Sequence, residues 1–328
     1  MKSNFDLDAL LTGIRSNDRA ALGRAITLVE SNTADDRDRA QTLLTKLLPD
    51  TGGAQRIGIS GVPGVGKSTF IESFGLQLVD GGHRVAVLAV DPSSSVSKGS
   101  ILGDKTRMEK LAASDRAYIR PSPTGGSLGG VARKTREAIL ACEAAGYDVV
   151  LVETVGVGQS ETTVAEMVDF FLLLKLAGAG DELQGIKRGI LELADLIAIN
   201  KADGDNLQAA EFARAEFERA IGILRPEDND GWKPRVVTSS GQTGDGLEEI
   251  WEIIGQHREM LMGSGGLEEQ RRHQLLGWMW SLVDEGLRAA VREHPEIAKT
   301  LADLEEKVLR GKSTPTSAAE KILKTFTS

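Results

Sequence analysis

The chain has 328 residues, of which 41% are hydrophobic, enough for a real core in one large domain with appendages or in two domains. Its 48 acidic and 39 basic residues give a formal net charge of -9, so we expect no nucleic-acid partner and no broad attraction to an anionic membrane. No stretch approaches 18 consecutive apolar residues, and the first residues match neither a signal peptide nor a transit peptide. We therefore expect a cytoplasmic protein whose phosphate binding, if any, is local.

Cysteine and histidine usage argues against a metal cluster built from these residues. The single cysteine, Cys142, lies in a helical pattern, so it forms no disulfide within the chain and is expected to be a buried, inert thiol. The four histidines are scattered, and no two have the spacing of metal ligands.

The first fifty residues are predicted to be helical. Apolar residues recur at helical spacing in residues 7–14, 20–30 and 39–48. Pro49 and the glycines at 52–53 then break the pattern. We predict a helical N-terminal extension over residues 1–52.

From Arg56 onward, short apolar runs alternate with helical patterns, which predicts an α/β domain over residues 53–262. Continuous apolar strands separated by helices indicate a mostly parallel sheet that is covered on both faces. The expected strands are "RIGIS" (56–60), "RVAVLAV" (84–90), "YDVVLVE" (147–153), "DFFLLL" (169–174), "DLIAIN" (195–200) and "RVVTSS" (235–240).

Residues 263–328 are predicted to form a helical C-terminal arm that begins with "GSGG" at 263–266 as a linker. Leu275, Met279 and Leu282 lie near one stripe of the first arm helix, beside two tryptophans. We expect this arm to make a homodimer; the alternative is a helix packed on its own domain.

The first predicted strand runs into "GVPGVGKS", which matches the phosphate-binding P-loop pattern and is followed by a helix. The glycines let backbone N–H groups wrap around phosphates, and the helix N-terminus adds its positive end. Lys67 is expected to reach the β- and γ-phosphates, and the Ser68 hydroxyl to ligate Mg²⁺. The expected phosphate-binding residues are Gly61, Val62, Pro63, Gly64, Val65, Gly66, Lys67, Ser68 and Thr69.

The stretch "INKAD" at the end of a later strand predicts that the base is guanine. Asp203 can accept two hydrogen bonds from guanine, whereas adenine would leave these polar groups unpaired at about 1–3 kcal/mol each, so discrimination of order 10²-fold or more is expected. Asn200 would brace the loop, and Lys201 would lie against the base. A backbone N–H of Ser239 or Ser240 is expected at the guanine carbonyl. The ligand is therefore predicted to be GTP or GDP.

Carboxylates at strand ends are the candidate metal ligands beside Ser68. Asp91 and Glu153 end strands that are expected to flank the P-loop strand, and Asp104 is a further candidate. Mg²⁺ needs few protein ligands because it keeps several waters. For Asp91 and Glu153 the alternative is a cap at the end of a strand.

The sequence "ETVGVGQSE" at 153–161 resembles the D-x-x-G switch of small GTPases, with Gly156 placed to sense the γ-phosphate. Gln159 is a candidate for orienting water, although that glutamine usually follows the glycine directly, where this chain has Val157. The displacement predicts slow intrinsic turnover, on the order of 10⁻⁴–10⁻² s⁻¹, with stimulation by a partner or by a second protomer.

Another loop, at 176–189, follows the strand "DFFLLL". Its Asp181, Gln184 and Lys187 would face the nucleotide or a partner, and Lys187 is a candidate catalytic group. A plain helix start is the alternative.

These motifs, in this order, resemble the methylmalonyl-CoA mutase-associated GTPases, which belong to the SIMIBI class and were formerly described as arginine/ornithine transport system kinases. The resemblance covers the whole chain. It implies a homodimeric GTPase that uses Mg²⁺ and binds an adenosylcobalamin-dependent acyl-CoA mutase, gating delivery of the cofactor and protecting the mutase. It also implies that the 176–189 loop is a further switch that is coupled to the partner.

Three other functions fit the sequence less well. A nickel-insertion GTPase that assembles a metallocentre would need Cys or His clusters near its switches. A protein-targeting GTPase would carry basic or Met-rich patches, and a P-loop kinase would leave the N-K-A-D motif unexplained. The mutase-associated function therefore remains the main expectation.

Overall fold

The structure is a computed structural model, and it describes residues 6–90, 108–121, 128–154, 160–178, 188–224 and 231–327. These residues form two compact units, Met1–Arg271 and Arg272–Ser328.

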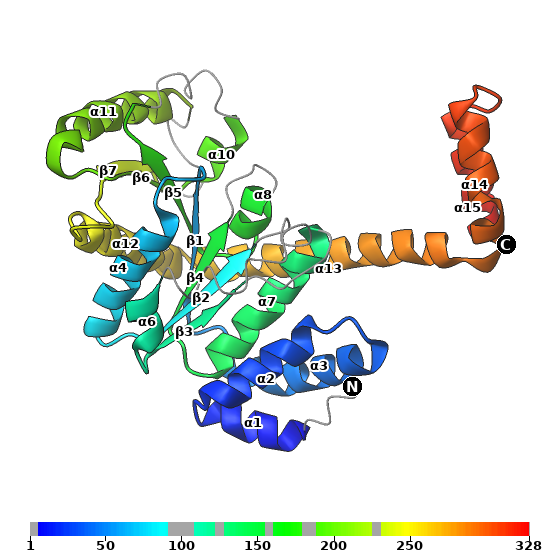
Figure 1. Ribbon diagram of the computed structural model, residues 1–328, viewed down its shortest axis with the longest axis horizontal. Coiled ribbons are helices and arrows are strands. Elements are labelled where there is room, and N and C mark those ends of the chain that lie inside the picture. Colours follow the sequence, from blue (N-terminus) through cyan, green and yellow to red (C-terminus); the bar gives the residue numbers. More distant parts are fainter. Residues whose placement is uncertain are drawn as a thin grey trace. The chain divides into compact units, whose positions relative to one another are not determined.

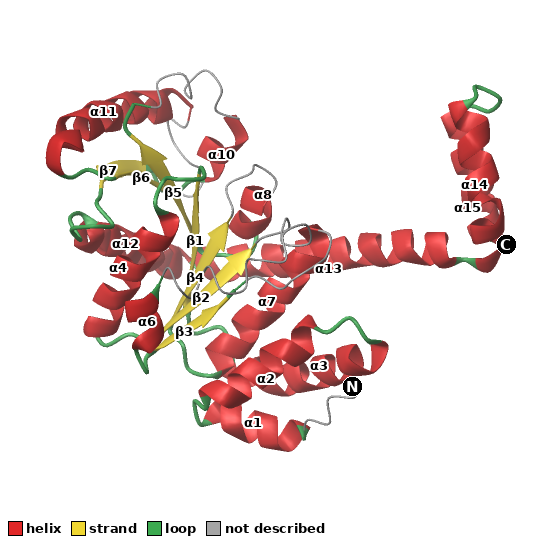
Figure 2. Cartoon of the chain, viewed as in Figure 1, coloured by secondary structure: helices red, strands yellow, loops and turns green. Residues whose placement is uncertain are grey.

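A seven-stranded sheet with strand order β3-β2-β4-β1-β5-β6-β7 lies at the centre of the first unit (Figure 1). Every pairing in it is parallel, which confirms the predicted α/β fold. Helices follow most strands along the chain, as Figure 2 shows. The strands are β1 (Gln55–Gly61), β2 (Val85–Val90), β3 (Ala117–Arg120), β4 (Val149–Thr154), β5 (Phe170–Leu176), β6 (Leu196–Asn200) and β7 (Arg235–Thr238).

Alternate strand residues enter two separate cores because successive side chains of a strand point to opposite faces. In β4, Val149 and Leu151 belong to one buried cluster, and Val150 and Val152 belong to the other. This two-sided burial explains why the strands are apolar without interruption.

Helices cover both faces of the sheet. The core on one face takes residues from α4 (Lys67–Asp80), α6 (Glu109–Ala113) and α12 (Leu247–Ser264). The core on the other face takes residues from α7 (Leu128–Ala144), α8 (Ser160–Ala165), α10 (Arg188–Leu193) and α11 (Leu207–Leu224). Short 3-10 turns lie at Leu48–Asp50 and Gly204–Asn206.

The N-terminal extension forms α1 (Leu7–Arg15), α2 (Arg19–Glu30) and α3 (Ala34–Leu47), whose apolar faces join the core that includes α7. Side chains of Asp6, Asp18 and Thr33 cap the three helices by accepting backbone N–H groups of the first turn. The predicted helices of this region are therefore present in the structure.

Two features differ from the sequence-based prediction. Strand β3 was not expected, because its four residues are few and an arginine ends the run. The break before the arm is also narrower than the predicted four-residue linker. Helix α12 continues to Ser264, and Gly265, in a left-handed conformation with φ 76°, alone separates it from α13 (Gly266–Glu293).

The second unit holds most of α13, together with α14 (Pro295–Leu309) and α15 (Pro315–Phe326). Ile297, Leu304 and Ala318 are buried in this unit, whereas none of the residues of α13, all of which the structure describes, is buried. Large apolar side chains are exposed along α13: Leu275, Leu276, Met279, Trp280, Val283 and Leu287. Among the described residues, no helix combines the length and apolar character needed to cross a membrane.

Candidate nucleotide site

The P-loop connects the end of β1 to the start of α4, as the sequence predicted. Gly66 stands at the N-cap of α4 with φ 93°, a backbone conformation that side chains disfavour. A Cβ at this position would lie 3.0 Å from the Asn200 side-chain nitrogen. The glycine is therefore required both by the turn and by the close approach of the base-binding segment.

Lys67 is the first residue of α4, and its side chain is turned back into the loop. Its Nζ donates hydrogen bonds to the carbonyl oxygens of Gly61 at 2.7 Å and Val62 at 3.3 Å. Burial lowers the pKa of Lys67, and the carboxylates of Glu153 and Glu161 oppose that shift. A cation held over a glycine loop at a helix N-terminus fits the phosphates of a nucleotide.

The donor set for a magnesium ion is partly within the described residues. Ser68 is half-buried in the first turn of α4, and the half-buried Glu153 lies on β4 in register with Ile59 of β1. A hydroxyl and a carboxylate on adjacent elements are oxygen ligands that Mg²⁺ accepts, together with water. No group of three or more His, Cys, Asp or Glu residues suited to a metal occurs in the part of the chain that the structure describes.

Asn200, at the end of β6, is bonded directly to the P-loop. Its Nδ2 donates to the carbonyl of Val65 at 2.8 Å, and its Oδ1 accepts from the Gly241 N–H at 3.2 Å. Lys201 follows with φ 61°, and its Nζ donates to the carbonyl of Gly64 at 2.9 Å. Two consecutive residues thus join the predicted base-binding segment to the predicted phosphate-binding loop.

The Asp203 carboxylate is held by Ser240, whose hydroxyl donates to Asp203 Oδ2. The same hydroxyl accepts the N–H groups of Gln242 at 3.2 Å and Thr243 at 3.1 Å. The backbone N–H groups that were expected at the guanine carbonyl have acceptors inside the protein: Ser239 N–H donates to Ile199 O and Ser240 N–H to Asp245 O, both at 2.9 Å. Ser240 therefore contributes to this site through its side chain.

Several predicted site residues lie outside the described residues. They are Asp91, Asp104, Gly156, Gln159, Asp181, Gln184 and Lys187. The strands that lead to three of these stretches, β2, β4 and β5, do end at the same edge of the sheet as β1, because all four strands are parallel neighbours.

Two contributions were missed in the sequence. Glu161 is 2% exposed at the start of α8 and acts electrostatically on Lys67. The only signal for it was its place in "ETVGVGQSE", close behind the switch motif. The Ser240 hydroxyl was missed because a hydrogen bond between residues 37 positions apart leaves no local pattern.

Comparisons with known proteins agree with this geometry. Residues 22–296 match the family described as "Methylmalonyl Co-A mutase-associated GTPase MeaB". A protein of Caulobacter vibrioides named "Putative GTPase" is 56% identical over 322 residues, covering 98% of both chains. The mouse protein named "Methylmalonic aciduria type A homolog, mitochondrial" is 48% identical, covering 98% of this chain and 80% of its own.

A solved structure has the same fold. It is titled "Crystal structure of LAO/AO transport system kinase", is 37% identical, covers 100% of both chains and has a TM-score of 0.80. The family match covers most of this chain. In the structure of the chain, the N-K-A-D segment is hydrogen-bonded to the P-loop. The chain therefore belongs to the methylmalonyl-CoA mutase-associated GTPases, and it is a GTPase that binds GTP and GDP.

Proposed function

We propose that this GTPase is a cytoplasmic chaperone of an adenosylcobalamin-dependent acyl-CoA mutase of the methylmalonyl-CoA mutase type. It gates delivery of the cofactor to the mutase and protects the mutase from inactivation. The observation that carries the proposal is the direct bonding of Asn200 and Lys201 to the P-loop, in a chain whose family is described as mutase-associated. Because these hydrogen bonds tie the base segment to the phosphate loop, a change at the phosphates can be sensed at the base segment.

The proposed nucleotide site assigns a role to each segment. The phosphates lie along Gly61–Thr69, with Lys67 on the β- and γ-phosphates, and Gly156 senses the γ-phosphate. Guanine is read by Asp203, Lys201 lies against the base, and Asn200 braces the loop. The Ser240 hydroxyl orients the Asp203 carboxylate through its hydrogen bond. The burial of Lys67 within its loop supports the first assignment.

Mg²⁺ is the proposed metal, and it would neutralise charge on the β- and γ-phosphates when bound. Ser68 and Glu153 are its proposed ligands, with Asp91 and Asp104 as further candidates. Candidates for catalysis are Lys67, Gln159 and Lys187. Intrinsic turnover is slow in this proposal and is raised by the partner.

We also propose that the protein is a homodimer formed through its C-terminal arm. The division into an extension (1–52), a GTPase domain (53–262) and an arm (263–328) is part of this proposal. The homodimer is supported by the row of exposed apolar side chains on α13, which includes Leu276, Met279 and Trp280. A helix face of this kind is typical of a protein–protein interface.

A capture experiment with defined nucleotides tests the mutase function. The tagged protein is incubated with native cytosol in GDP or in a non-hydrolysable GTP analogue, and bound proteins are identified by mass spectrometry. We expect a cobalamin-dependent mutase whose captured amount differs about fivefold or more between the two nucleotides, the usual lower range of allosteric coupling. Capture without a mutase in either state would contradict the proposal.

Transfer of the cofactor is measured on purified proteins. The rate at which adenosylcobalamin loads onto the apo-mutase is followed by absorbance, with GTP, GDP or no nucleotide. The Lys67→Ala variant is the matched control, because it keeps the surface of the GTPase and is expected to lose the nucleotide response. A loading rate that is the same with GTP, with GDP and without nucleotide, and the same for the wild type and Lys67→Ala, would rule out gating.

A further inference from the structure

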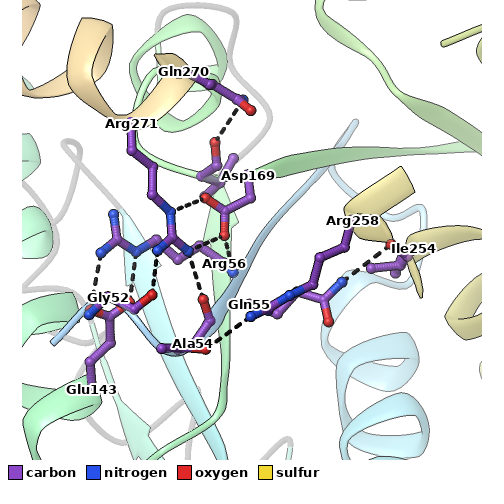
Figure 3. Close-up of polar contacts among 12 residues, drawn as sticks. Gly52, Ala54, Gln55, Arg56, Glu143, Asp169, Ile254, Arg258, Gln270 and Arg271 are labelled. Carbon is purple, nitrogen blue, oxygen red and sulfur yellow. Dashed lines mark hydrogen bonds and ion pairs between the residues drawn. The ribbon is translucent and has the colours of Figure 1, made fainter. Parts of the chain in front are cut away.

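A cluster of buried and half-buried charged side chains lies at the opposite end of the strands from the nucleotide site. Its four members are Arg56 at the start of β1, Glu143 on α7, Asp169 just before β5, and Arg271 in the first turns of α13 (Figure 3). Their side chains are 14%, 1%, 6% and 15% exposed, respectively. We refer to these four residues as the Arg271 clamp.

Arg271 uses its whole guanidinium group in this clamp. Nε and Nη2 donate to the two Asp169 carboxylate oxygens at 2.8 and 2.7 Å. Nη1 donates to the carbonyl of Gly52 at 2.6 Å, and Nη2 also donates to the carbonyl of Ala54 at 2.7 Å. The paired bonds to one carboxylate fix both the distance and the plane of the group.

Asp169 and Glu143 connect this guanidinium to the sheet. Asp169 Oδ2 accepts the Arg56 N–H at 2.9 Å, and the Asp169 N–H donates to Arg56 O at 2.8 Å. The Arg56 side chain makes a second paired contact, with Glu143, at 2.8 and 3.0 Å. Glu143 also accepts the Gly52 N–H at 2.7 Å. The clamp therefore joins the first strand, α7, the start of β5 and the root of α13.

A short, closely packed segment leads from the nucleotide side to the clamp. Helix α8 follows residues 155–159, which hold the proposed γ-phosphate sensor, and it ends four residues before Asp169. A Cβ added to Gly58 of β1 would lie 3.0 Å from Val164 Cγ1 and 3.1 Å from Val168 Cγ2. The segment from α8 to Asp169 thus packs on β1 with no spare room.

The two ends of this segment face the two sites. At the start of α8, the charge of Glu161 opposes the lowering of the Lys67 pKa, and near Asp169 the Gln270 side chain donates to Val168 O at 3.5 Å. Val164 of α8 and Val168 both pack on Gly58, so the short chain from α8 to Asp169 offers a direct path for a displacement of α8. There it meets the two side chains that fix the first turns of α13, Gln270 and Arg271.

We propose that the Arg271 clamp couples the nucleotide state of the P-loop site to the first turns of α13. A paired guanidinium–carboxylate contact tolerates little misalignment, so it passes on a displacement that an apolar contact would absorb by sliding. Anchoring alone does not account for buried charge here, because apolar side chains of similar size stabilise a buried position as well or better. The coupling goes beyond the proposed chaperone function and does not require a mutase.

Hydrogen exchange on the full-length protein tests the coupling. Amide exchange of residues 267–275 is compared in saturating GDP and in a non-hydrolysable GTP analogue. In the wild-type protein we expect rates that differ about fivefold or more between the two nucleotides, the usual lower range of coupling. Equal exchange in both states would overturn the proposal, and this measurement does not depend on any variant.

The variant Arg271→Gln removes the paired contact and the charge and leaves a shorter, neutral polar side chain. We expect it to reduce the nucleotide-dependent difference at residues 267–275 to less than about twofold while both nucleotides still bind. Arg258→Gln is the matched control. Arg258 donates to Gly53 O at 3.0 Å, in the same segment before β1 that Arg271 contacts, and none of the bonds described above joins Arg258 to Asp169. A variant of Arg271 that keeps the full wild-type difference would overturn the proposal.

Coupling is reciprocal, so nucleotide affinity gives a second measurement. A residue with only a structural role would not change the ratio of the two nucleotide affinities. If α13 senses the nucleotide, breaking the clamp must change the ratio of GDP to GTP-analogue affinity, by about fivefold or more if the coupling is in its usual range. Arg271→Lys, which keeps the charge but loses the paired geometry, is expected to lie between the wild type and Arg271→Gln. An unchanged affinity ratio in a folded Arg271→Lys or Arg271→Gln protein contradicts the coupling.

Discussion

The side-chain amide of Asn200, at the end of β6, donates to the carbonyl of Val65 in the P-loop across 2.8 Å. Asn200 is 1% exposed, and its oxygen accepts the Gly241 N–H, so one buried amide links the P-loop, the N-K-A-D segment and the segment after β7. Three stretches that are distant in sequence meet at this residue. Its removal should affect phosphate and base binding together.

Asn200→Ala is expected to weaken GTP and GDP binding equally. A buried acceptor and donor left unpaired cost about 1–3 kcal/mol, which corresponds to roughly 5- to 150-fold in affinity. Isothermal titration calorimetry with both nucleotides measures the loss, with Asn32→Ala in the N-terminal extension as the control. Unchanged affinity would show that the amide does not brace the nucleotide site.

Ser240→Ala is expected to reduce the preference for guanine. The hydroxyl donates to Asp203, and losing one such hydrogen bond costs about 0.5–1.5 kcal/mol, so the ratio of GTP to ATP affinity should fall roughly 2- to 12-fold. Calorimetry on the wild-type protein should first show strong GTP and weak ATP binding. Thr238→Ala, whose hydroxyl bonds to Glu211 instead, is the control. A ratio that stays constant would mean that Asp203 is oriented without Ser240.

Lys67→Ala is expected to abolish hydrolysis or nucleotide binding. The ammonium is held over the loop by Gly61 and Val62, and hydrogen bonds to a charged group contribute about 1.5–3 kcal/mol each. Release of phosphate from GTP is the measurement, and Lys46→Ala on the exposed surface of α3 is the control. A wild-type rate in Lys67→Ala would refute the assignment of the P-loop.

Trp280→Glu is expected to convert a dimer into a monomer. Trp280 is 62% exposed in the row of apolar side chains on α13, and burying an unpaired carboxylate in an interface costs several kcal/mol. Light scattering coupled to size exclusion gives the mass. The control is Leu309→Glu, at the end of α14, where the side chain is 87% exposed. A dimer that survives the Trp280 change would place the interface elsewhere.

The sequence predicted the parts of this protein that depend on local chemistry. The β1–loop–α4 unit was evident because glycine spacing, a lysine and a strand–helix context occur within a dozen residues. Strand β3 was not, because four residues ending in Arg120 carry too little periodicity. The sheet was expected to be mostly parallel and is parallel throughout the described pairings.

Contacts between segments that are distant in the sequence could not be predicted from local sequence patterns. Asp169 and Arg271 are 102 positions apart, and each is an ordinary charged residue in its local context. Glu161 similarly resembles any acidic residue in the first turn of a helix. Burial makes an unpaired charge costly, so it is the burial of these residues that makes their partners important. That burial depends on how helices pack on the sheet, which the local sequence does not show.

The bonds from Arg271 to the carbonyls of Gly52 and Ala54 have a consequence for the architecture of the GTPase core. They fasten the segment before β1 to the first turns of α13, two stretches more than 200 positions apart in the sequence. A cut in a surface loop between these two stretches would therefore leave the two halves of the chain joined at this point, so that nicking a loop need not separate them.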